Sequence, residues 1–136
     1  DKKIVSVEGD GGFLIHSSML ATAAEYNMPI TWVVVNNSSY GTVWGLQRQY
    51  FENRSIFTEF KYEDDAVYVP DYAKVAEGFN VKGFRVEKPE DIRPALEAAL
   101  KHEGPALVDV VVDRVFSSTP PTVSRCGWDK YYPYWE

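Results

Sequence analysis

The sequence predicts an α/β fold, in which helices lie on both faces of an open parallel sheet. Short runs rich in β-branched residues alternate with segments whose apolar residues have helical spacing, and two of the runs, 30–35 and 106–112, are almost continuously apolar. A continuous apolar run is typical of a strand that is covered on both faces. Strands that alternate with helices favour a parallel sheet, because parallel neighbours need a crossover connection. At 136 residues, the chain has the size of one domain.

The first part of the chain is typical of a βαβ unit. A short strand is expected at 4–7, followed by a tight turn over 8–12, where three glycines occur. Helical spacing of small and apolar residues predicts a helix over 17–26, with a serine as its N-cap. Met28-Pro29 ends this helix, and the strand at 30–35 follows.

The rest of the chain continues the alternation of helices and strands. The expected elements are a helix over 42–50, a long ordered loop to residue 69, a helix over 71–79, a strand at 81–86, a helix over 89–101 and a strand at 106–112. Asp71 is the expected N-cap of its helix. Pro94 is compatible with the following helix only if it lies in the first turn.

The composition excludes several classes of function. The net charge is -6 and the basic residues are scattered, so the chain has no electrostatic footprint for nucleic acid. No segment reaches the roughly 18 to 20 apolar residues of a membrane span. Cys126 is the only cysteine, which excludes an internal disulfide or a thiolate metal cluster and favours a cytoplasmic location.

The predicted domain covers residues 1–113, and its N-terminal part is expected to be missing, because the chain runs almost at once into a strand. The remaining stretch, 114–136, carries five Trp and Tyr side chains after Pro120-Pro121. So much aromatic surface is costly to leave in water. We therefore expect an aromatic tail that either docks on a partner or covers a functional site.

Two polar residues follow two successive strands of the predicted sheet. Asp10 follows the first strand and Asn37 the second, so a single crossover brings both to the carboxyl edge where parallel sheets bind ligands. Carboxylate and amide oxygens suit Mg²⁺, which takes its other ligands from phosphate and water. Gly11 and Gly12 allow close approach of a phosphate to the backbone. His16 either reaches this ligand or has only a capping or core-edge role.

These residues carry a resemblance to a known family. Gly9-Asp10-Gly11, followed after 24 residues by Asn36-Asn37, resembles the motif of thiamine diphosphate-dependent enzymes. Further similar segments are Leu20-Ala21-Thr22, Tyr26-Asn27-Met28-Pro29, Glu52-Asn53-Arg54, Val86-Glu87-Lys88-Pro89-Glu90 and Gly104-Pro105-Ala106-Leu107-Val108-Asp109-Val110. The resemblance extends over residues 1–113. It is greatest to acetolactate synthase large subunits, with benzoylformate decarboxylase next.

The resemblance implies a set of site residues. The metal ligands would be Asp10, the side chain of Asn37 and the main-chain carbonyl of Ser39. The residues that bind thiamine diphosphate would be Gly9, Asp10, Gly11, Gly12, Phe13, Asn37, Ser39, Tyr40 and Gly41. The side chains that face the substrate would be Thr42, Val43 and Leu46.

The chain also departs from the family pattern. Gly12 stands where many members carry Ser, and Met19 where carboligases usually carry Glu. Val43 replaces the catalytic Glu of pyruvate decarboxylases, and Leu46 replaces a Trp typical of acetohydroxyacid synthases. These departures disfavour a simple acetaldehyde-releasing decarboxylase and a role in branched-chain amino-acid synthesis.

The resemblance implies an enzyme that decarboxylates a 2-oxo acid, ligates the resulting acyl carbanion, or does both. An aromatic 2-oxo acid decarboxylase or an aldehyde lyase of the same family is an alternative. In the family, a Glu from another domain of a neighbouring subunit activates the cofactor, so the expected partners are upstream domains and a second subunit in a homodimer or homotetramer. Two non-catalytic alternatives are a flavodoxin-like diphosphate-binding module and a purely structural fragment.

Overall fold

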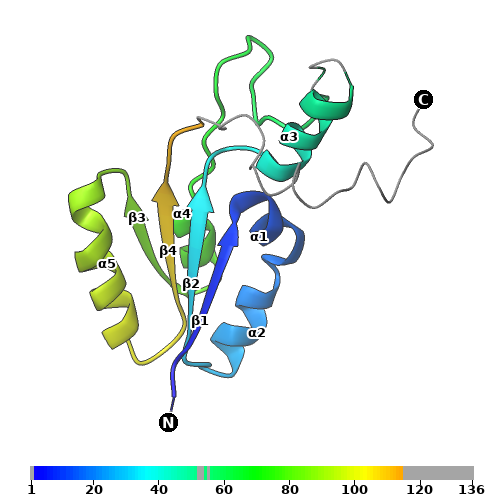
Figure 1. Cartoon of the computed structure of the whole chain (residues 1–136). Helices are drawn as coiled ribbons and strands as arrows, with labels where there is room; N and C mark the ends of the chain where they lie inside the picture. Colours follow the sequence, from blue (N-terminus) through cyan, green and yellow to red (C-terminus); the bar gives the residue numbers. More distant parts are fainter. Residues whose placement is uncertain (1, 52–53, 55, 115–136) are drawn as a thin grey trace, which may run out of the picture.

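The computed structural model describes residues 2–51, 54 and 56–114, which form a four-stranded parallel sheet with helices against both faces (Figure 1). The strands are β1 (Ile4–Gly9), β2 (Ile30–Asn36), β3 (Lys82–Val86) and β4 (Ala106–Val111), arranged in the order β1-β2-β4-β3. The predicted α/β class is therefore confirmed. Asp1, Glu52-Asn53 and the aromatic stretch from residue 115 onward, which includes Cys126, lie outside the described residues.

Helices cover the two faces of the sheet unequally. They are α1 (Asp10–His16), α2 (Met19–Glu25), α3 (Gly41–Tyr50), α4 (Tyr72–Gly78) and α5 (Pro89–Lys101). Helices α1, α2 and α4 contribute to the core on one face, and α5 contributes to the core on the other. The predicted N-cap is confirmed, because Asp71 Oδ1 accepts a hydrogen bond of 3.0 Å from the Lys74 N–H.

The prediction of a tight turn over residues 8–12 is wrong. β1 continues to Gly9, and α1 begins at Asp10 with no intervening loop. Neither Gly9 nor Gly11 adopts a left-handed backbone conformation, so the glycines are not required by turn geometry. A second short helix, α2, then begins at Met19, and Ser18 occupies its N-cap position without a side-chain capping hydrogen bond.

Pro94 lies in the interior of α5, so the expectation that this helix tolerates a proline only in its first turn is wrong. A proline at this position removes one backbone hydrogen bond near the start of the helix. The helix continues because its apolar face, which includes Ile92, Leu96 and Ala99, packs on β3 and β4. No helix in the part of the chain that the structure describes is long and apolar enough to cross a membrane.

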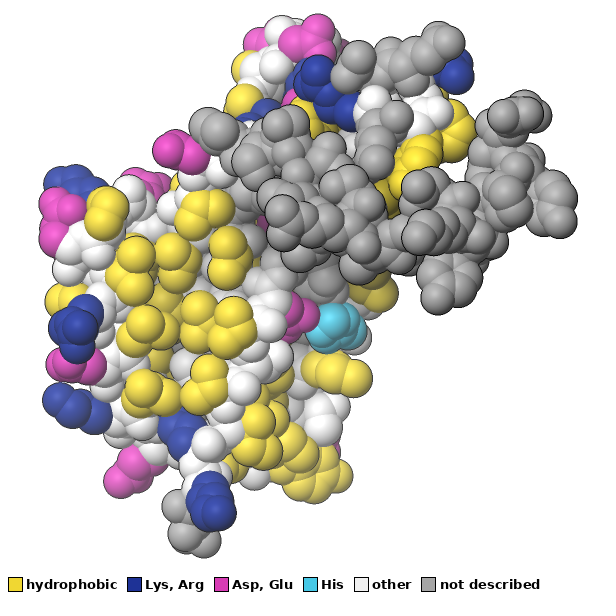
Figure 2. All heavy atoms as spheres, viewed as in Figure 1, with side chains coloured by type: hydrophobic (Ala, Val, Ile, Leu, Met, Phe, Trp, Pro, Cys, Tyr) yellow, Lys and Arg dark blue, Asp and Glu magenta, His cyan; other side chains and the backbone are white. Residues whose placement is uncertain are grey.

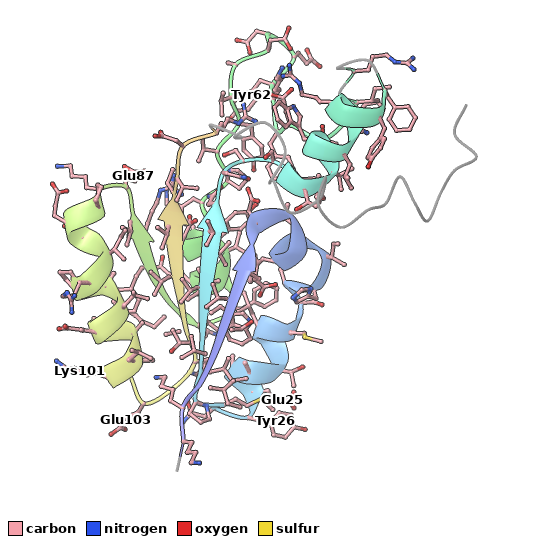
Figure 3. The ribbon with its side chains drawn as sticks, viewed as in Figure 1. Glu25, Tyr26, Tyr62, Glu87, Lys101 and Glu103 are labelled. Carbon is pink, nitrogen blue, oxygen red and sulfur yellow. The ribbon has the colours of Figure 1, made fainter. Side chains whose placement is uncertain are left out.

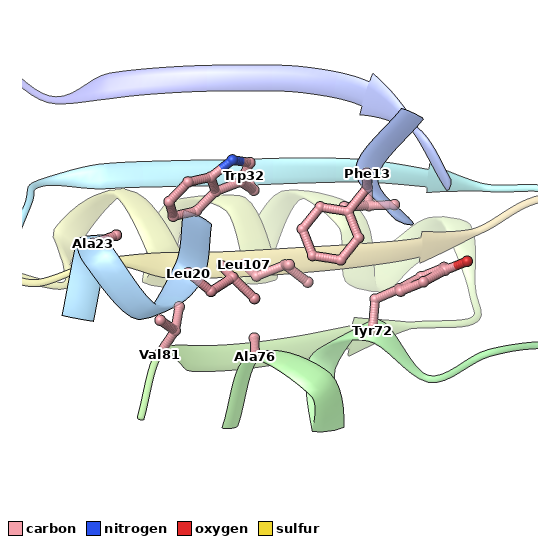
Figure 4. Close-up of a cluster of buried hydrophobic side chains, with 9 residues drawn as sticks. Phe13, Leu20, Ala23, Trp32, Tyr72, Ala76, Val81 and Leu107 are labelled. Carbon is pink, nitrogen blue, oxygen red and sulfur yellow. The ribbon is translucent and has the colours of Figure 1, made fainter. Parts of the chain in front are cut away.

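The larger core cluster lies between the sheet and helices α1, α2 and α4 (Figure 4). Its members include Phe13, Leu20, Trp32, Tyr72 and Leu107, which come from five different elements. Phe13 and Tyr72 meet edge to face, with ring centroids 5.3 Å apart. Full burial of side chains of this size stabilises a fold by roughly 1.5–3 kcal/mol each. The cluster therefore fixes α1 against the carboxyl half of the sheet.

The opposite face of the sheet is only partly covered. Helix α5 packs over β3 and β4, whereas Val5, Val7 and Val35 remain 49%, 68% and 39% exposed on β1 and β2. Figure 2 shows apolar side chains gathered over this face. Parallel sheets are normally covered on both faces. Residues 2–114 therefore leave one half of one sheet face without a covering layer.

Gly83 on β3 should be intolerant of substitution. A Cβ atom there would lie 2.4 Å from the Ala73 carbonyl oxygen, whereas a Cβ at Gly78 would meet nothing within 4 Å. Because backbone atoms cannot move aside cheaply, we expect Gly83→Ala to lower the free energy of unfolding by about 1–3 kcal/mol. Gly78→Ala is the matched control and should be neutral or slightly stabilising. Equal urea unfolding midpoints for the two variants would contradict this packing.

Candidate functional site

Polar residues gather at the carboxyl end of the sheet. Strands β1 and β2 are parallel neighbours, and Gly9 at the end of β1 lies opposite Val35. The residues that follow these strands, Asp10 and Asn37, are therefore delivered to the same edge. Figure 3 shows Glu87 toward this end of the molecule and Glu103 at the opposite end.

The Asp10 carboxylate is buried and lies between two backbone segments. One oxygen, Oδ1, accepts a hydrogen bond of 2.9 Å from the Gly11 N–H, and Oδ2 accepts one of 3.2 Å from the Ser39 N–H. Asp10 is 1% exposed, and this burial raises the pKa of its carboxyl above the ordinary value. The Ser39 contact joins the first residue of α1 to the loop after β2.

The loop between β2 and α3 is tightly folded. Asn37 Oδ1 accepts a hydrogen bond of 3.0 Å from the Ser39 hydroxyl. Ser38 has a φ of 55°, a left-handed conformation that is uncommon for a residue other than glycine. Ser39 and Glu59 form an antiparallel bridge, so the loop is paired with the segment that follows α3. Two of the three predicted metal ligands, Asn37 and Ser39, thus belong to one constrained turn.

A buried polar network holds the start of this loop. The Asn36 side chain donates to Asp109 Oδ1 at 3.0 Å and to the Pro70 carbonyl at 2.9 Å, while its Oδ1 accepts from the Ser38 N–H at 3.2 Å. The Arg85 guanidinium donates to Asp109 Oδ2 at 2.8 Å, and the Tyr72 N–H donates to the same oxygen at 3.1 Å. Asn36 is therefore held directly from β4 and from the segment that leads into α4, and Arg85 on β3 holds both of those acceptors in place.

The predicted phosphate-binding glycines have different surroundings. Gly11 is buried against the Tyr40 ring, and a Cβ at Gly11 would lie 2.4 Å from Tyr40 Cδ1. Gly12 is exposed, and a Cβ there would have as its nearest neighbour Glu8 Oε2 at 3.7 Å. Gly9 is exposed at the end of β1. The side chain of Phe13 packs in the core, so only its main chain is free to take part in the site.

The predicted metal ligands form an all-oxygen set with one carboxylate. No group of three His, Cys, Asp or Glu side chains able to hold a metal occurs among the described residues. A cation bound to Asp10, Asn37 and the Ser39 carbonyl would therefore need further oxygen ligands, as Mg²⁺ obtains from phosphate and water. The chemistry of these donors fits Mg²⁺ held together with a diphosphate.

Tyr72 gives a second indication of a ligand at this end of the sheet. Its hydroxyl is buried and has no hydrogen-bond partner within the described residues. Figure 4 shows this hydroxyl pointing toward the carboxyl ends of the strands. Burial, and next the charge of Asp10, raise the pKa of the Tyr72 phenol, so the group stays a proton donor. A bound oxygen ligand near Asp10 would give that donor an acceptor.

The predicted substrate-facing residues lie on α3. Thr42, Val43 and Leu46 are all exposed, and Val43 and Leu46 are 47% and 39% accessible. Tyr40 precedes this helix, and its ring meets Phe60 edge to face with centroids 5.3 Å apart. Gly41 is the first residue of α3. Helix α3 therefore begins next to Asp10 and Ser39 and presents accessible apolar side chains.

Sequence reasoning missed the charged pair that supports the site. Asp109 is fully buried within an otherwise apolar strand, and that isolation among valines and leucine was a signal of a structural role. Its partner Arg85 carried no comparable signal. His16, expected either to reach a ligand or to have a capping or core-edge role, has its Nε2 atom 2.8 Å from Glu8 Oε2.

Comparison with known proteins identifies the family. The model of the thiamine pyrophosphate enzyme C-terminal TPP-binding domain matches residues 1–110. A 3D-(3,5/4)-trihydroxycyclohexane-1,2-dione hydrolase of Halalkalibacterium halodurans is 40% identical over 112 residues, which are 82% of this chain and 17% of that protein. A probable acetolactate synthase large subunit of Methanococcus aeolicus is 32% identical over 123 residues, which are 89% of this chain and 20% of the relative.

A solved structure agrees with these matches. The thiamine diphosphate-dependent 4-hydroxybenzoylformate decarboxylase of Rhodococcus jostii RHA1 superposes with a TM-score of 0.71 at 26% identity, covering 88% of this chain and 21% of that chain. The chain thus spans about a fifth of the length of the relatives that it matches. The matched residues include both halves of the candidate site, and the chain belongs to the thiamine pyrophosphate enzymes as their C-terminal TPP-binding domain.

Proposed function

We propose that the chain is the thiamine diphosphate- and Mg²⁺-binding part of an enzyme that decarboxylates a 2-oxo acid, ligates the resulting acyl unit, or does both. One observation carries the proposal. The hydrogen bond of 3.2 Å from the Ser39 N–H to Asp10 joins two halves of an oxygen-rich site at the ends of adjacent parallel strands. Asp10, the Asn37 side chain and the Ser39 carbonyl would hold the metal.

The diphosphate would be held mainly by backbone groups. Gly12 is exposed and has no Cβ, so its N–H can approach a phosphate oxygen closely. Gly9, Tyr40 and Gly41 border the same edge. The scattered basic residues and the net charge of -6 offer no cluster of cations for the phosphates. A divalent metal would therefore supply the neutralising charge, which is the arrangement expected where Mg²⁺ bridges protein carboxylates and phosphate.

The chemistry at the carbonyl carbon is supplied by the cofactor when bound, because its thiazolium ring accepts the electrons left by CO₂ loss. The residues of α3 would shape the substrate pocket and exclude water. Thr42, Val43 and Leu46 are accessible, and neither Val43 nor Leu46 can transfer a proton. Cofactor activation is assigned to a Glu from a neighbouring subunit, as the resemblance to the family implies. By itself, the chain would not complete the reaction.

Upstream domains of the same protein and a second subunit are the proposed partners, in a homodimer or homotetramer. The chain spans about a fifth of its relatives, and Val5, Val7 and Val35 leave an apolar face beside β1 and β2. We assign this face to a helix from the upstream polypeptide, because a parallel sheet needs a second covering layer. The single cysteine of the sequence supports a cytoplasmic location.

A second candidate function is hydrolysis of a cyclic 1,2-dione. It is favoured by the 40% identity to the trihydroxycyclohexanedione hydrolase, which exceeds the 32% identity to the acetolactate synthase.

We expect the full-length protein to release CO₂ from a 2-oxo acid in the presence of thiamine diphosphate and Mg²⁺. A coupled CO₂ assay and a dione-cleavage assay run side by side distinguish the two, and dione cleavage without CO₂ release would favour the hydrolase.

Removal of the Asp10 carboxylate should strongly weaken cofactor binding. In the full-length protein, we expect Asp10→Ala to weaken Mg²⁺-dependent thiamine diphosphate binding by more than the roughly 10- to 100-fold that the loss of an outer-shell partner costs. Asp91→Ala is the matched control, because Asp91 is exposed on α5. Calorimetric titration measures the effect. If the parent protein bound no cofactor, the site would be that of a non-catalytic or purely structural module.

The two adjacent glycines should respond differently to substitution. Gly11→Ala would place a Cβ 2.4 Å from Tyr40 Cδ1, so the ring and the loop that carries it must shift. Overpacking of this kind costs about 1–3 kcal/mol, and we expect thiamine diphosphate affinity to fall about tenfold. Gly12→Ser, whose Cβ would make an ordinary contact of 3.7 Å, should retain binding. Equal thiamine diphosphate affinities of the two variants would contradict the expectation that the close contact between Gly11 and the Tyr40 ring shapes the site.

A further inference from the structure

Arg114 makes three hydrogen bonds to main-chain carbonyls around the candidate site. Its Nε donates to the Asn37 carbonyl at 3.3 Å, and its Nη2 donates to the Ser38 carbonyl at 2.6 Å and to the Phe60 carbonyl at 3.0 Å. The side chain is partly buried, and it follows β4 by three residues. One guanidinium therefore connects the loop after β2 with the segment after α3.

These contacts reinforce a loop that is already held from two sides. The Asn36 side chain accepts from the Ser38 N–H, which supports the left-handed conformation of Ser38. On the other side, the Tyr40 N–H donates to the Thr58 carbonyl at 2.8 Å and the Phe60 N–H donates to the Ser38 carbonyl at 3.0 Å. Backbone conformations of this kind persist when the surroundings over-determine them. Arg114 adds a third set of contacts that hold the loop in this conformation.

The carbonyls that Arg114 occupies differ from the proposed metal ligands. It binds the main-chain oxygens of Asn37 and Ser38, whereas the metal would take the Asn37 side chain and the Ser39 carbonyl. The guanidinium can therefore orient the peptide planes of the loop while the ligand oxygens remain available. The planar fork of an arginine suits several acceptors at fixed angles, and a lysine ammonium does not reproduce it.

We propose that Arg114 is a positioning residue for the Mg²⁺ and diphosphate site. It holds the Asn37–Ser39 turn in the conformation that binds the metal, and it acts through the main chain without touching the cofactor. This inference rests on the proposed function. It also gives a role to a residue that follows the part of the chain matched by the family model, which ends at residue 110.

The test uses the full-length protein in four forms: the parent, Arg114→Ala, Arg114→Lys and Arg93→Ala. Arg93 is exposed on α5 and serves as the matched control. Mg²⁺ is titrated calorimetrically into each apo protein at saturating thiamine diphosphate, below the temperature at which circular dichroism shows unfolding. We expect Arg114→Ala to weaken Mg²⁺ binding by about 10- to 100-fold, as for loss of an outer-shell partner. Arg114→Lys should lie between Arg114→Ala and the parent, and Arg93→Ala should match the parent.

The outcomes separate this inference from the proposed function. Parent-like Mg²⁺ affinity in a folded Arg114→Ala protein would overturn the positioning role and leave the proposed function intact. If Arg114→Ala does not fold, Arg114→Lys decides, and parent-like affinity in that variant would again overturn the role. A parent protein that binds no thiamine diphosphate with Mg²⁺ would overturn the proposed function itself. A change in thermal stability with unchanged Mg²⁺ affinity would show that Arg114 only stabilises the fold.

Discussion

The carboxylate of Asp109 is fully buried on β4, one of the two inner strands of the sheet, and neighbouring elements at the carboxyl end of the sheet donate hydrogen bonds to it. A buried charge without partners would be strongly destabilising. Burial raises the pKa of the Asp109 carboxyl, and donors from Asn36, Tyr72 and Arg85 oppose that shift. Because these donors belong to β2, the start of α4 and β3, one electrostatic requirement ties four elements together. Asn36 then carries the constraint into the adjacent loop.

The two aspartates that are buried among the described residues, Asp10 and Asp109, are stabilised differently. Asp109 is paired with the Arg85 guanidinium, so its charge is balanced within the fold. Asp10 is equally buried, but its hydrogen bonds come from the backbone, and no ion pair between described residues includes it. A divalent cation would balance the Asp10 charge as arginine balances that of Asp109. This contrast gives a physical reason for assigning a structural role to one residue and a ligand-binding role to the other.

The uncovered half of one sheet face lies beside the candidate site. The core on the α1, α2 and α4 side is closed by large side chains, whereas Val5 and Val7 stay exposed on the α5 side. The site is thus built on one well-packed layer and lies next to apolar surface that further polypeptide can cover. That arrangement agrees with a domain that spans about a fifth of the length of its relatives.

The sequence alone determined the fold class and the meeting of Asp10 with the Asn37 loop, because strand and helix periodicities are local and a crossover delivers successive strands to one edge. Only the tertiary structure decided what the glycines do. Gly11 meets Tyr40 and Gly83 meets Ala73, so close packing requires them and not a turn. The contacts of Arg114 join residues up to 77 positions apart. Such contacts depend on how irregular loops fold against the sheet, and no periodic pattern in the sequence encodes that.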